Sequence, residues 1–460
     1  MYLILGSRIT VVNPTDEISK WCKDNLILSN PEYTKKQRMG FWVGNTPKTI
    51  SLYEKHGNDL VLPYGCLYDI QKFPIEQMYP DFTENEKVDF HAEIPLYDYQ
   101  ETAKNEMLKS VCGILQSPAG SGKTQTMLAV AAAIGRKTLW IAHTKDLVLQ
   151  SKERAERYIP SELIGTITEG KVEIGSVITF ATVQTLSKLD LGRYKDEWDC
   201  VIVDEAHRIS GSPTNLTMYA KVLNSLYARR KYGMTATVHR SDGMIKATES
   251  LIGKVVYHVP DSAVSEKIMT VNIMPVQTQV GLDDCCIGTD GMLIYSNLIN
   301  YLAFDECRNS MILTDLICNR FHYCLILSDR LAQLEYLKNS LPDDLREQAV
   351  MIDGKMVSKT AKQEREQALE DMRQGKKRYL FATYALAKEG LDIPRLDRLF
   401  FATPVKDYAV VTQSIGRIAR TFDGKQDPIV YDYVDNNVKY LVKSYKKRCT
   451  TYRKSNCRFL

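Results

Sequence analysis

Short apolar runs alternate with helix-forming segments from about residue 91 to the end of the chain. Such runs, bounded by polar or turn residues, are typical of parallel strands that are buried on both faces. We predict strands at 111–116, 139–143, 177–180 and 200–204, and again at 323–327, 349–352, 378–382, 396–401 and 429–433. The alternation weakens between about 262 and 290. The pattern therefore predicts an α/β protein with two successive blocks, each built on a parallel sheet.

Residues 1–90 have a different texture, rich in Trp, Tyr and Phe and without long helical periodicity. This favours a small α+β domain in front of the two blocks, ending at the polar, turn-like stretch 80–87. The predicted organisation is an accessory domain, a first α/β domain, a connector and a second α/β domain with a basic C-terminal tail, at 1–90, 91–262, 263–298 and 299–460.

A glycine-bearing loop at 117–124 joins the strand predicted at 111–116 to an Ala-rich helix that Gly135 ends. Small residues let successive backbone N–H groups surround phosphate oxygens, and the helix N-terminus faces the same anion. The loop departs from the usual pattern at its first position, where Ser replaces Gly. It predicts a site for ATP, with Lys123 at the β and γ phosphates and Thr124 on Mg²⁺. The nucleotide-binding candidates are Ser117, Ala119, Gly120, Ser121, Gly122, Lys123 and Thr124.

A second candidate element is the acidic pair that follows the strand predicted at 200–204. Asp204 is expected to hold Mg²⁺ opposite Thr124, and Glu205 to orient and deprotonate the attacking water. A strand ending in a solvated acidic turn is the structural alternative. The phosphate loop about 80 residues upstream favours the catalytic interpretation.

With these motifs in place, the stretch from about 96 to 422 resembles the superfamily 2 DExH-box helicases and translocases. The motifs in family order are Leu96-Tyr97-Asp98-Tyr99-Gln100, the phosphate loop, Ala142-His143-Thr144-Lys145-Asp146-Leu147, Thr179-Phe180-Ala181-Thr182-Val183-Gln184, Asp204-Glu205-Ala206-His207, Met234-Thr235-Ala236-Thr237, Leu325-Ile326-Leu327-Ser328, Ala382-Thr383 through Asp392, and Gln413-Ser414-Ile415-Gly416-Arg417-Ile418-Ala419-Arg420. Residues 235–243 are similar to branch-migration and XPB-like members. The N-terminal block, with Trp42 and 50–53, resembles those of phage branch-migrating helicases.

The resemblance implies two tandem RecA-like domains that close on ATP and Mg²⁺. It implies catalytic roles for Lys123, Glu205, His207, Gln413, Arg417 and Arg420. It adds Gln100, Gly390 and Asp392 to the nucleotide site, and nucleic-acid contacts at Thr144, Thr182, Gln184, Arg240, Ser328 and Thr383. Tyr97 stands where many relatives have Arg, which bears on selectivity for adenine, and Val238 replaces a frequent Pro.

Two basic stretches lie outside these motifs. Residues 33–42 mix cations with aromatic rings, so Lys35 and Trp42 are candidates for contacting a nucleic-acid backbone and stacking on bases. The alternative is a domain whose aromatic residues form its core. After Lys439 the chain carries seven Lys or Arg, and no acidic residue follows Asp435, which suits either DNA contact or a solvated helix face.

Composition indicates the cellular compartment more clearly than it indicates the activity. Net charge is +4, divided as −2 over residues 1–90 and +6 over the remainder, which neither demands nor opposes a nucleic-acid partner. Eleven Cys without a CxxC pair give no signal for a metal cluster and suit a reducing environment. The N-terminus does not resemble a signal peptide and no apolar run approaches membrane-spanning length. We therefore expect a cytoplasmic protein, in the host cytoplasm if phage-encoded, with no membrane partner.

These features together favour an ATP-dependent DNA helicase or translocase that unwinds or branch-migrates forked or junction DNA in replication, recombination or repair. Two alternatives stay open. An RNA helicase would share the motor motifs, because they do not identify the sugar. An ATP-switched clamp would open and close on nucleic acid without net movement.

Overall fold

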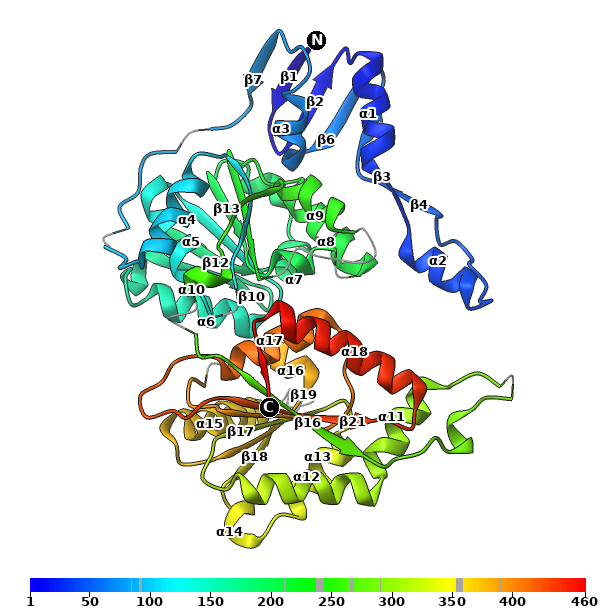
Figure 1. The fold of residues 1–460 in the computed structure, drawn as a ribbon. Helices are drawn as coiled ribbons and strands as arrows, with labels where there is room; N and C mark the ends of the chain where they lie inside the picture. Colours follow the sequence, from blue (N-terminus) through cyan, green and yellow to red (C-terminus); the bar gives the residue numbers. More distant parts are fainter. Residues whose placement is uncertain are drawn as a thin grey trace. The chain divides into compact units, whose positions relative to one another are not determined.

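The computed structural model describes residues 1–83, 85–90, 93–118, 120–210, 212–236, 244–264, 268–289, 291–352, 359–388, 391 and 393–460. The chain divides into two compact units (Figure 1). Unit 1 comprises Met1–Pro118 and Gly122–Pro260, and the main part of unit 2 is Asp261–Leu460. None of the helices in the described part of the chain combines the length and the apolar character that crossing a bilayer requires.

Unit 1 begins with a five-stranded sheet in the order β5-β6-β2-β1-β7. Its core contains Leu3, Ile9 and Leu62, and one face packs on α1 through Ile18 and Cys22. The strands are β1 (Tyr2–Leu5), β2 (Arg8–Val12), β5 (Glu54–His56), β6 (Asp59–Pro63) and β7 (Gln77–Pro80), with helices α1 (Asp16–Leu26) and α3 (Leu67–Ile70). This part is the α+β structure predicted from the composition of residues 1–90.

An arm extends from this small sheet between α1 and β5 (Figure 1). Its base is a two-stranded antiparallel sheet in which Leu28 pairs with Ile50. The arm consists of β3 (Ile27–Ser29), α2 (Pro31–Arg38) and β4 (Thr49–Ser51). Pro31 at the first turn and the Asn30 side chain, which accepts from the N–H of Glu32, start α2 in the way that helix caps commonly do.

The larger sheet of unit 1 has the order β11-β10-β12-β9-β13-β14-β8-β15. All its pairings are parallel except that of β10 with β11. The strands are β8 (Cys112–Gln116), β9 (Thr138–Ala142), β10 (Ile164–Thr168), β11 (Lys171–Glu173), β12 (Ile178–Thr182), β13 (Cys200–Val203), β14 (Arg230–Thr235) and β15 (Val255–His258). The strands expected near 112, 139, 178 and 200 are thereby confirmed, together with the parallel arrangement.

Helices cover both faces of this sheet. Trp140 and Ile202 point into a core shared with α4 (Asp98–Leu108), α5 (Lys123–Ile134) and α6 (Lys145–Ala155). Their sequence neighbours Leu139 and Val201 point into the opposite core, shared with α7 (Val183–Leu186), α8 (Pro213–Leu223) and α9 (Ile245–Ile252). This alternation explains why central strands such as β9 and β13 are nearly continuous apolar runs.

Unit 2 contains a seven-stranded sheet in the order β18-β19-β17-β20-β21-β16-β22, and its pairings are parallel. The strands are β16 (Asn272–Thr278), β17 (Cys324–Ser328), β18 (Ala349–Ile352), β19 (Tyr379–Thr383), β20 (Arg398–Phe401), β21 (Ile429–Asp435) and β22 (Arg458–Phe459). Part of the segment expected as a connector, 263–298, thus contributes β16 to this sheet. Part of the expected basic tail contributes β22.

The helices of unit 2 also lie on two faces. Leu325 and Leu327 share a core with α15 (Lys359–Gln374), α16 (Tyr384–Lys388), α17 (Tyr408–Ile418) and α18 (Lys439–Lys454). Ile326 faces α12 (Glu306–Cys318) and α13 (Leu331–Asn339). The remaining helices are α10 (Asp261–Val264), α11 (Tyr295–Phe304) and α14 (Asp343–Arg346). Two RecA-like α/β domains preceded by a small α+β domain are the fold that the sequence predicts.

Candidate nucleotide site and nucleic-acid contacts

The phosphate loop lies between β8 and α5, at the carboxyl end of a parallel strand where α/β sheets bind ligands. Gly120 and Gly122 have φ values of +83° and +75°, which turn the backbone tightly into the helix. Lys123 begins α5, and its ammonium donates to the carbonyl of Pro118 at 3.2 Å. The loop therefore holds its lysine beside the N–H groups expected to bind phosphate.

Gln100 lies directly against this loop. A Cβ built on Gly122 would meet Gln100 Nε2 at 2.4 Å, so only glycine leaves room for the amide. The side chain is 2% exposed, and its Oε1 accepts from the backbone N–H of Tyr97 at 3.0 Å in a capping box at the start of α4. The structure thus brings together Gln100 and the loop, although they are separated by about twenty residues of sequence. Its role in recognising adenine stays a prediction.

The acidic pair follows β13, which is separated from β8 by one strand, β14. Glu205 has a left-handed backbone with φ of +48°, a conformation that costs energy for a residue with a Cβ and is frequent at functional sites. His207 Nδ1 lies 3.2 Å from Glu205 Oε2 and 2.9 Å from the hydroxyl of Thr235. The carbonyl of Thr235 accepts from the N–H of Ser117 at 3.0 Å. The end of β14 therefore connects the acidic pair to the phosphate loop.

The two carboxyl groups have opposite pKa shifts. Burial, followed by the charge of Glu205, raises the pKa of Asp204 to about 7. Burial would also raise the pKa of Glu205, but His207, Lys123 and Arg208 outweigh it and hold the pKa at about 2. Glu205 is therefore ionised at neutral pH, which is the form a general base needs. Lys123 and Arg154 lower the pKa of Asp204 but do not offset its burial, so Asp204 is only partly ionised at neutral pH.

Arg154 of α6 is one of these two cations, and the motif analysis did not identify it. Its Nη1 donates to the hydroxyl of Thr124 at 3.0 Å, and its guanidinium interacts electrostatically with Asp204. Ser151, one turn earlier on α6, donates to Asp204 Oδ2 at 3.4 Å. In the sequence, Arg154 is only a cation on the helix that follows the third motif, and nothing there marks it as part of the site. Its contact depends on how α6 packs on the sheet.

The carboxylate of Asp204 and the hydroxyl of Thr124 are also suitable ligands for a magnesium ion. Both groups interact with the Arg154 guanidinium, so a cation already lies beside them. Mg²⁺ is usually held by one or two carboxylates together with substrate phosphates. Among the described residues, no group of three or more His, Cys, Asp or Glu is arranged to bind a metal by itself. Thr124 and Asp204 would accordingly hold Mg²⁺ only together with nucleotide.

The remaining catalytic candidates belong to unit 2. Gln413 and Arg417 lie on α17, and Arg417 Nη1 donates to the carbonyl of Leu391 at 3.1 Å. Arg420 follows the helix and forms a β-bridge with Ile268. Gln413 is 8% exposed. The hydrolytic roles of Gln413, Arg417 and Arg420 stay predictions. Four further candidates, Ala119, Arg240, Gly390 and Asp392, lie outside the described residues.

The hydroxyl groups expected to contact nucleic acid have local partners. Thr144 Oγ1 accepts from the N–H of Leu147 as the cap of α6, and Thr182 Oγ1 bonds to Thr185 Oγ1 at 2.9 Å. Ser328 is fully buried and donates to Gln333 at 2.7 Å. Thr383 and Gln184 are half-buried at the end of β19 and in α7. Their contacts with nucleic acid stay predictions.

The arm carries the other two candidates on its surface. The Trp42 side chain is 87% exposed, and Lys35 is also exposed on α2. Lys36 is different, because it pairs with Glu32 at 2.9 Å and donates to Thr46 at 2.8 Å, which fixes the loop after α2. A Cβ on Gly44 would meet the Trp42 ring at 2.7 Å. The indole therefore rests one side on Gly44 and leaves the rest of its surface open.

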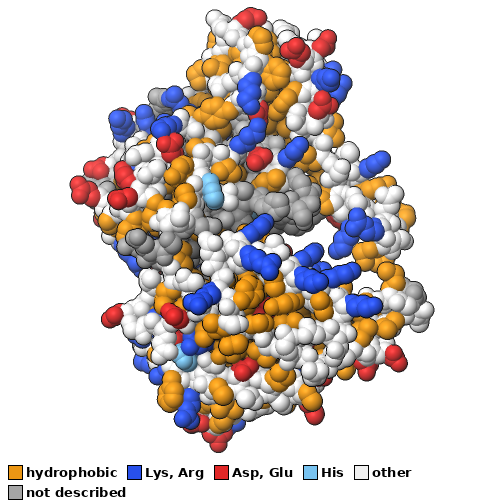
Figure 2. Space-filling model, viewed as in Figure 1, with side chains coloured by type: hydrophobic (Ala, Val, Ile, Leu, Met, Phe, Trp, Pro, Cys, Tyr) orange, Lys and Arg blue, Asp and Glu red, His pale blue; other side chains and the backbone are white. Residues whose placement is uncertain are grey.

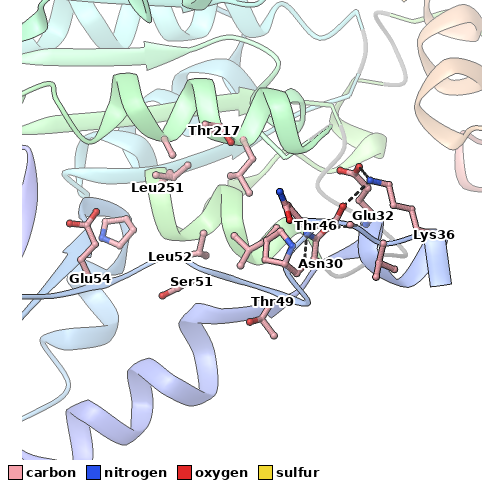
Figure 3. A pocket seen from close by; sticks show the side chains of 18 of the residues that line it. Asn30, Glu32, Lys36, Thr46, Thr49, Ser51, Leu52, Glu54, Thr217 and Leu251 are labelled. Carbon is pink, nitrogen blue, oxygen red and sulfur yellow. Dashed lines mark hydrogen bonds and ion pairs between the residues drawn. The ribbon is translucent and has the colours of Figure 1, made fainter. Parts of the chain in front are cut away.

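A cavity of about 720 Å³ lies between the arm and helices α8 and α9. Figure 3 shows Thr217 and Leu251 of these helices facing Thr46 and Leu52 of the arm side. Trp42 and Asn45 also line it. The volume falls in the range of about 300–1,000 Å³ that is common for ligand pockets.

A phosphate loop after one parallel strand and an acidic pair after a nearby strand define a P-loop nucleoside triphosphatase. Residues 93–240 match the family described as type III restriction enzyme, res subunit, and residues 309–422 match the helicase conserved C-terminal domain. The chain belongs to the superfamily 2 helicases, and its activity is that of an ATP-dependent helicase.

Relatives of the chain carry helicase names. It is 25% identical over 438 residues to "Probable helicase D10" of Escherichia phage T5, which covers 94% of this chain and 90% of that protein. It is 32% identical over 166 residues, 36% of each chain, to "DNA 3'-5' translocase XPB2" of Sulfurisphaera tokodaii. The solved structure of S. cerevisiae Dbp5 bound to RNA and ADP BeF3 has a TM-score of 0.55 at 16% identity, covering 79% of this chain and 89% of that one. This last likeness concerns the fold alone.

Proposed function

We propose that the protein uses ATP hydrolysis to unwind or branch-migrate forked or junction DNA, in replication, recombination or repair. The choice of DNA draws on the DNA translocase that matches 166 residues, or 36%, of this chain. The single observation that supports a preference for branched DNA is the arm, because it places an exposed Trp42 and an exposed Lys35 outside the helicase domains.

The hydrolytic roles belong to the proposal as well. Lys123 would stabilise the phosphates, and Glu205, ionised and oriented by His207, would take the proton of the attacking water. When bound, Mg²⁺ supplies charge neutralisation at the β and γ phosphates. Thr124 and Asp204 would hold it there. Arg417 and Arg420 would neutralise charge developing on the γ-phosphoryl group, a task for which a guanidinium is well suited.

A motor that holds one strand by its phosphates cannot by itself distinguish a fork from a plain overhang, because phosphates carry no junction information. A second surface must supply the preference. The Trp42 indole is held against Gly44, so a base can stack on it with little loss of side-chain freedom. The cavity beside the arm offers space next to that ring.

The first prediction concerns this surface. Changing Lys35→Ala and Trp42→Ala together should weaken fork binding by about tenfold or more, since stacking contributes about 1–3 kcal/mol per base and the lysine adds a phosphate contact. Fluorescence anisotropy with forked, overhang and single-stranded DNA, and with a matched RNA fork, measures the preference. The matched control is Lys55→Ala with Tyr79→Ala. These residues are an exposed lysine and an exposed aromatic of the five-stranded sheet, outside the arm.

Equal loss of affinity for forks and single strands would contradict a junction-sensing arm, as would an unchanged preference in a folded variant. Tighter binding of the RNA fork would favour the RNA helicase. Strand displacement from an annealed fork separates a motor from a clamp, because a clamp hydrolyses ATP without releasing the strand.

A further inference from the structure

The outward face of α18 is a row of cations. Six charged side chains on this helix are exposed, and Figure 2 shows Lys and Arg side chains gathered over it. They are Lys439, Lys443, Lys446, Lys447, Arg453 and Lys454. Their spacing of three, four, seven or eight residues places them on one side of an α-helix. We call this surface the α18 face.

The opposite side of α18 fixes the helix to the sheet. Arg448 is 2% exposed and binds Asp432 of β21 through two bonds, Nη2 to Oδ1 at 2.7 Å and Nε to Oδ2 at 2.9 Å. Tyr452 donates to the same carboxylate at 2.7 Å, and Arg448 Nη1 donates to the carbonyl of Val405 at 2.8 Å. The α18 face is therefore presented by a helix with little freedom to turn.

The α18 face is not neutralised from within the described part of the chain. No acidic residue follows Asp435, and Asp435 itself is buried. None of the six side chains forms an ion pair among the described residues, and Lys454 instead lies 5.7 Å above the Tyr408 ring of α17. Clustered like charges repel each other, so an unneutralised row is stabilised by a polyanion.

The dimensions fit the backbone of a duplex. A helix of 16 residues is about 24 Å long, and one strand of B-DNA presents a phosphate about every 3.4 Å along its axis. A duplex lying along the face would thus pass about seven phosphates of one strand. Single strands are usually held on exposed aromatic rings, yet Tyr440 and Tyr445 of this helix are half-buried and Tyr452 is buried.

We propose that the α18 face binds the sugar–phosphate backbone of a duplex arm of the DNA substrate. This inference rests on the proposed function, since it assigns the duplex part of a branched substrate to unit 2. Binding is independent of sequence, because lysine and arginine contacts to phosphate position the duplex without reading bases.

The test removes three of the cations with Lys443→Gln, Lys447→Gln and Arg453→Gln in the full chain. The matched control is Arg320→Gln, Arg346→Gln and Lys376→Gln, which removes the same charge from exposed positions of unit 2. In both, affinity for a short blunt duplex and for a single strand is measured by anisotropy between about 50 and 200 mM salt. Thermal melting establishes that each variant is folded.

The α18 variant should bind duplex more weakly, and its plot of log K against log salt should flatten by about 0.9 per lost phosphate contact. Single-strand affinity should fall less, and the control should keep the duplex slope. An unchanged duplex slope in the α18 variant would overturn the inference. An equal loss for duplex and single strand would overturn the assignment to duplex.

Failure here is distinguishable from failure of the proposed function. If the arm variant loses its fork preference while the α18 variant keeps the duplex slope, the proposed function stands and the α18 assignment falls. If the α18 variant loses duplex affinity while the arm variant keeps its fork preference, the reverse holds.

Discussion

Arg154 shows how much of the nucleotide site is decided by single side chains. It joins the hydroxyl of Thr124 to the charge of Asp204, the two groups expected to hold Mg²⁺. A buried carboxylate is stable in its charged form only beside a compensating cation. The free protein therefore carries part of this compensation in its own guanidinium.

We expect Arg154→Gln to lower the melting temperature of the nucleotide-free protein. Removing one partner of a buried charged contact costs about 1–3 kcal/mol, or several degrees for a unit of this size. Saturating Mg²⁺ with a non-hydrolysable ATP analogue should restore most of the loss, because the metal supplies a cation to the same oxygen atoms. Differential scanning fluorimetry with and without ligand measures both effects.

Lys152→Gln is the matched control, since Lys152 lies on the same helix but forms an i,i+4 pair with Glu156 at 3.3 Å. An equal deficit of Arg154→Gln in the presence and absence of ligand would show that Arg154 supports the fold rather than the metal site.

The residues found from sequence alone share one property. Lys123, Thr124, Asp204 and Glu205 belong to short motifs whose geometry is set by the strand and loop that carry them. Arg154 and the bond between His207 and Thr235 depend instead on how separate elements pack. Spacing along the chain does not encode that packing, so such contacts required the structure.

At the scale of elements, nine strands of the two large sheets were predictable, whereas strands such as β14 and β16, and the C-terminal segment, were not. Both-face burial makes each strand a continuous apolar run, which is a strong local signal. The sequence after Lys439 shows only an excess of positive charge, and Arg448 was counted among the cations available for DNA contact. The structure corrects that count, because Arg448 is buried against Asp432 and is a structural residue of α18.

Breaking this ion pair should destabilise unit 2 selectively. Arg448→Ala leaves Asp432 charged in a buried position, and removing one partner of a buried pair costs about 3–5 kcal/mol. All four Trp, at positions 21, 42, 140 and 198, belong to unit 1. In urea the variant should lose far-UV circular dichroism early while Trp fluorescence keeps its wild-type transition.

Lys447→Ala provides the control, since it removes an exposed cation next to Arg448 in sequence. If the fluorescence transition shifted by the same amount as the circular dichroism, the pair would act on unit 1 as well and the selective role would be wrong.

At the scale of the whole molecule, one part of residues 1–90 packs on the first helicase domain and another part, the arm, extends away from that contact. The segment that follows β6, residues 64–70, packs on the first RecA-like domain, where Tyr64 donates to the carbonyl of Arg229 at 2.9 Å and Lys254 pairs with Asp69 at 2.6 Å. The arm carries its exposed residues away from that contact. Deleting 1–90 would therefore uncover the motor as well as remove the arm, so point variants test the arm more cleanly.

Lys231 lies at the centre of this contact and makes it sensitive to pH. Its ammonium donates to the carbonyls of Ser7 and Leu223, both at 2.7 Å, and lies 5.0 Å above the Tyr64 ring. The residue is only 1% exposed, and burial lowers the pKa of its amine to about 7. The burial of Lys231 could not be predicted from the sequence, because it follows Arg230 at the start of β14 and no local pattern identifies its partners.

The last prediction follows from that shift. The unfolded chain keeps a lysine proton up to a pKa of about 10.4, whereas the folded protein releases it above about pH 7. Between these values the unfolded state binds more protons, so the Lys231 contribution to the free energy of unfolding rises with pH. Buried thiols such as Cys112, with a pKa raised to about 12, act in the opposite direction above about pH 8.5. Subtracting the urea-unfolding free energies of Lys231→Met from wild type removes that shared effect, and the difference should climb from pH 7 to 10 by up to about 1.4 kcal/mol per pH unit. Lys254→Met, which removes an exposed amine from the same contact, should give a flat difference, and a flat difference for Lys231→Met would mean that its amine stays charged in the folded protein.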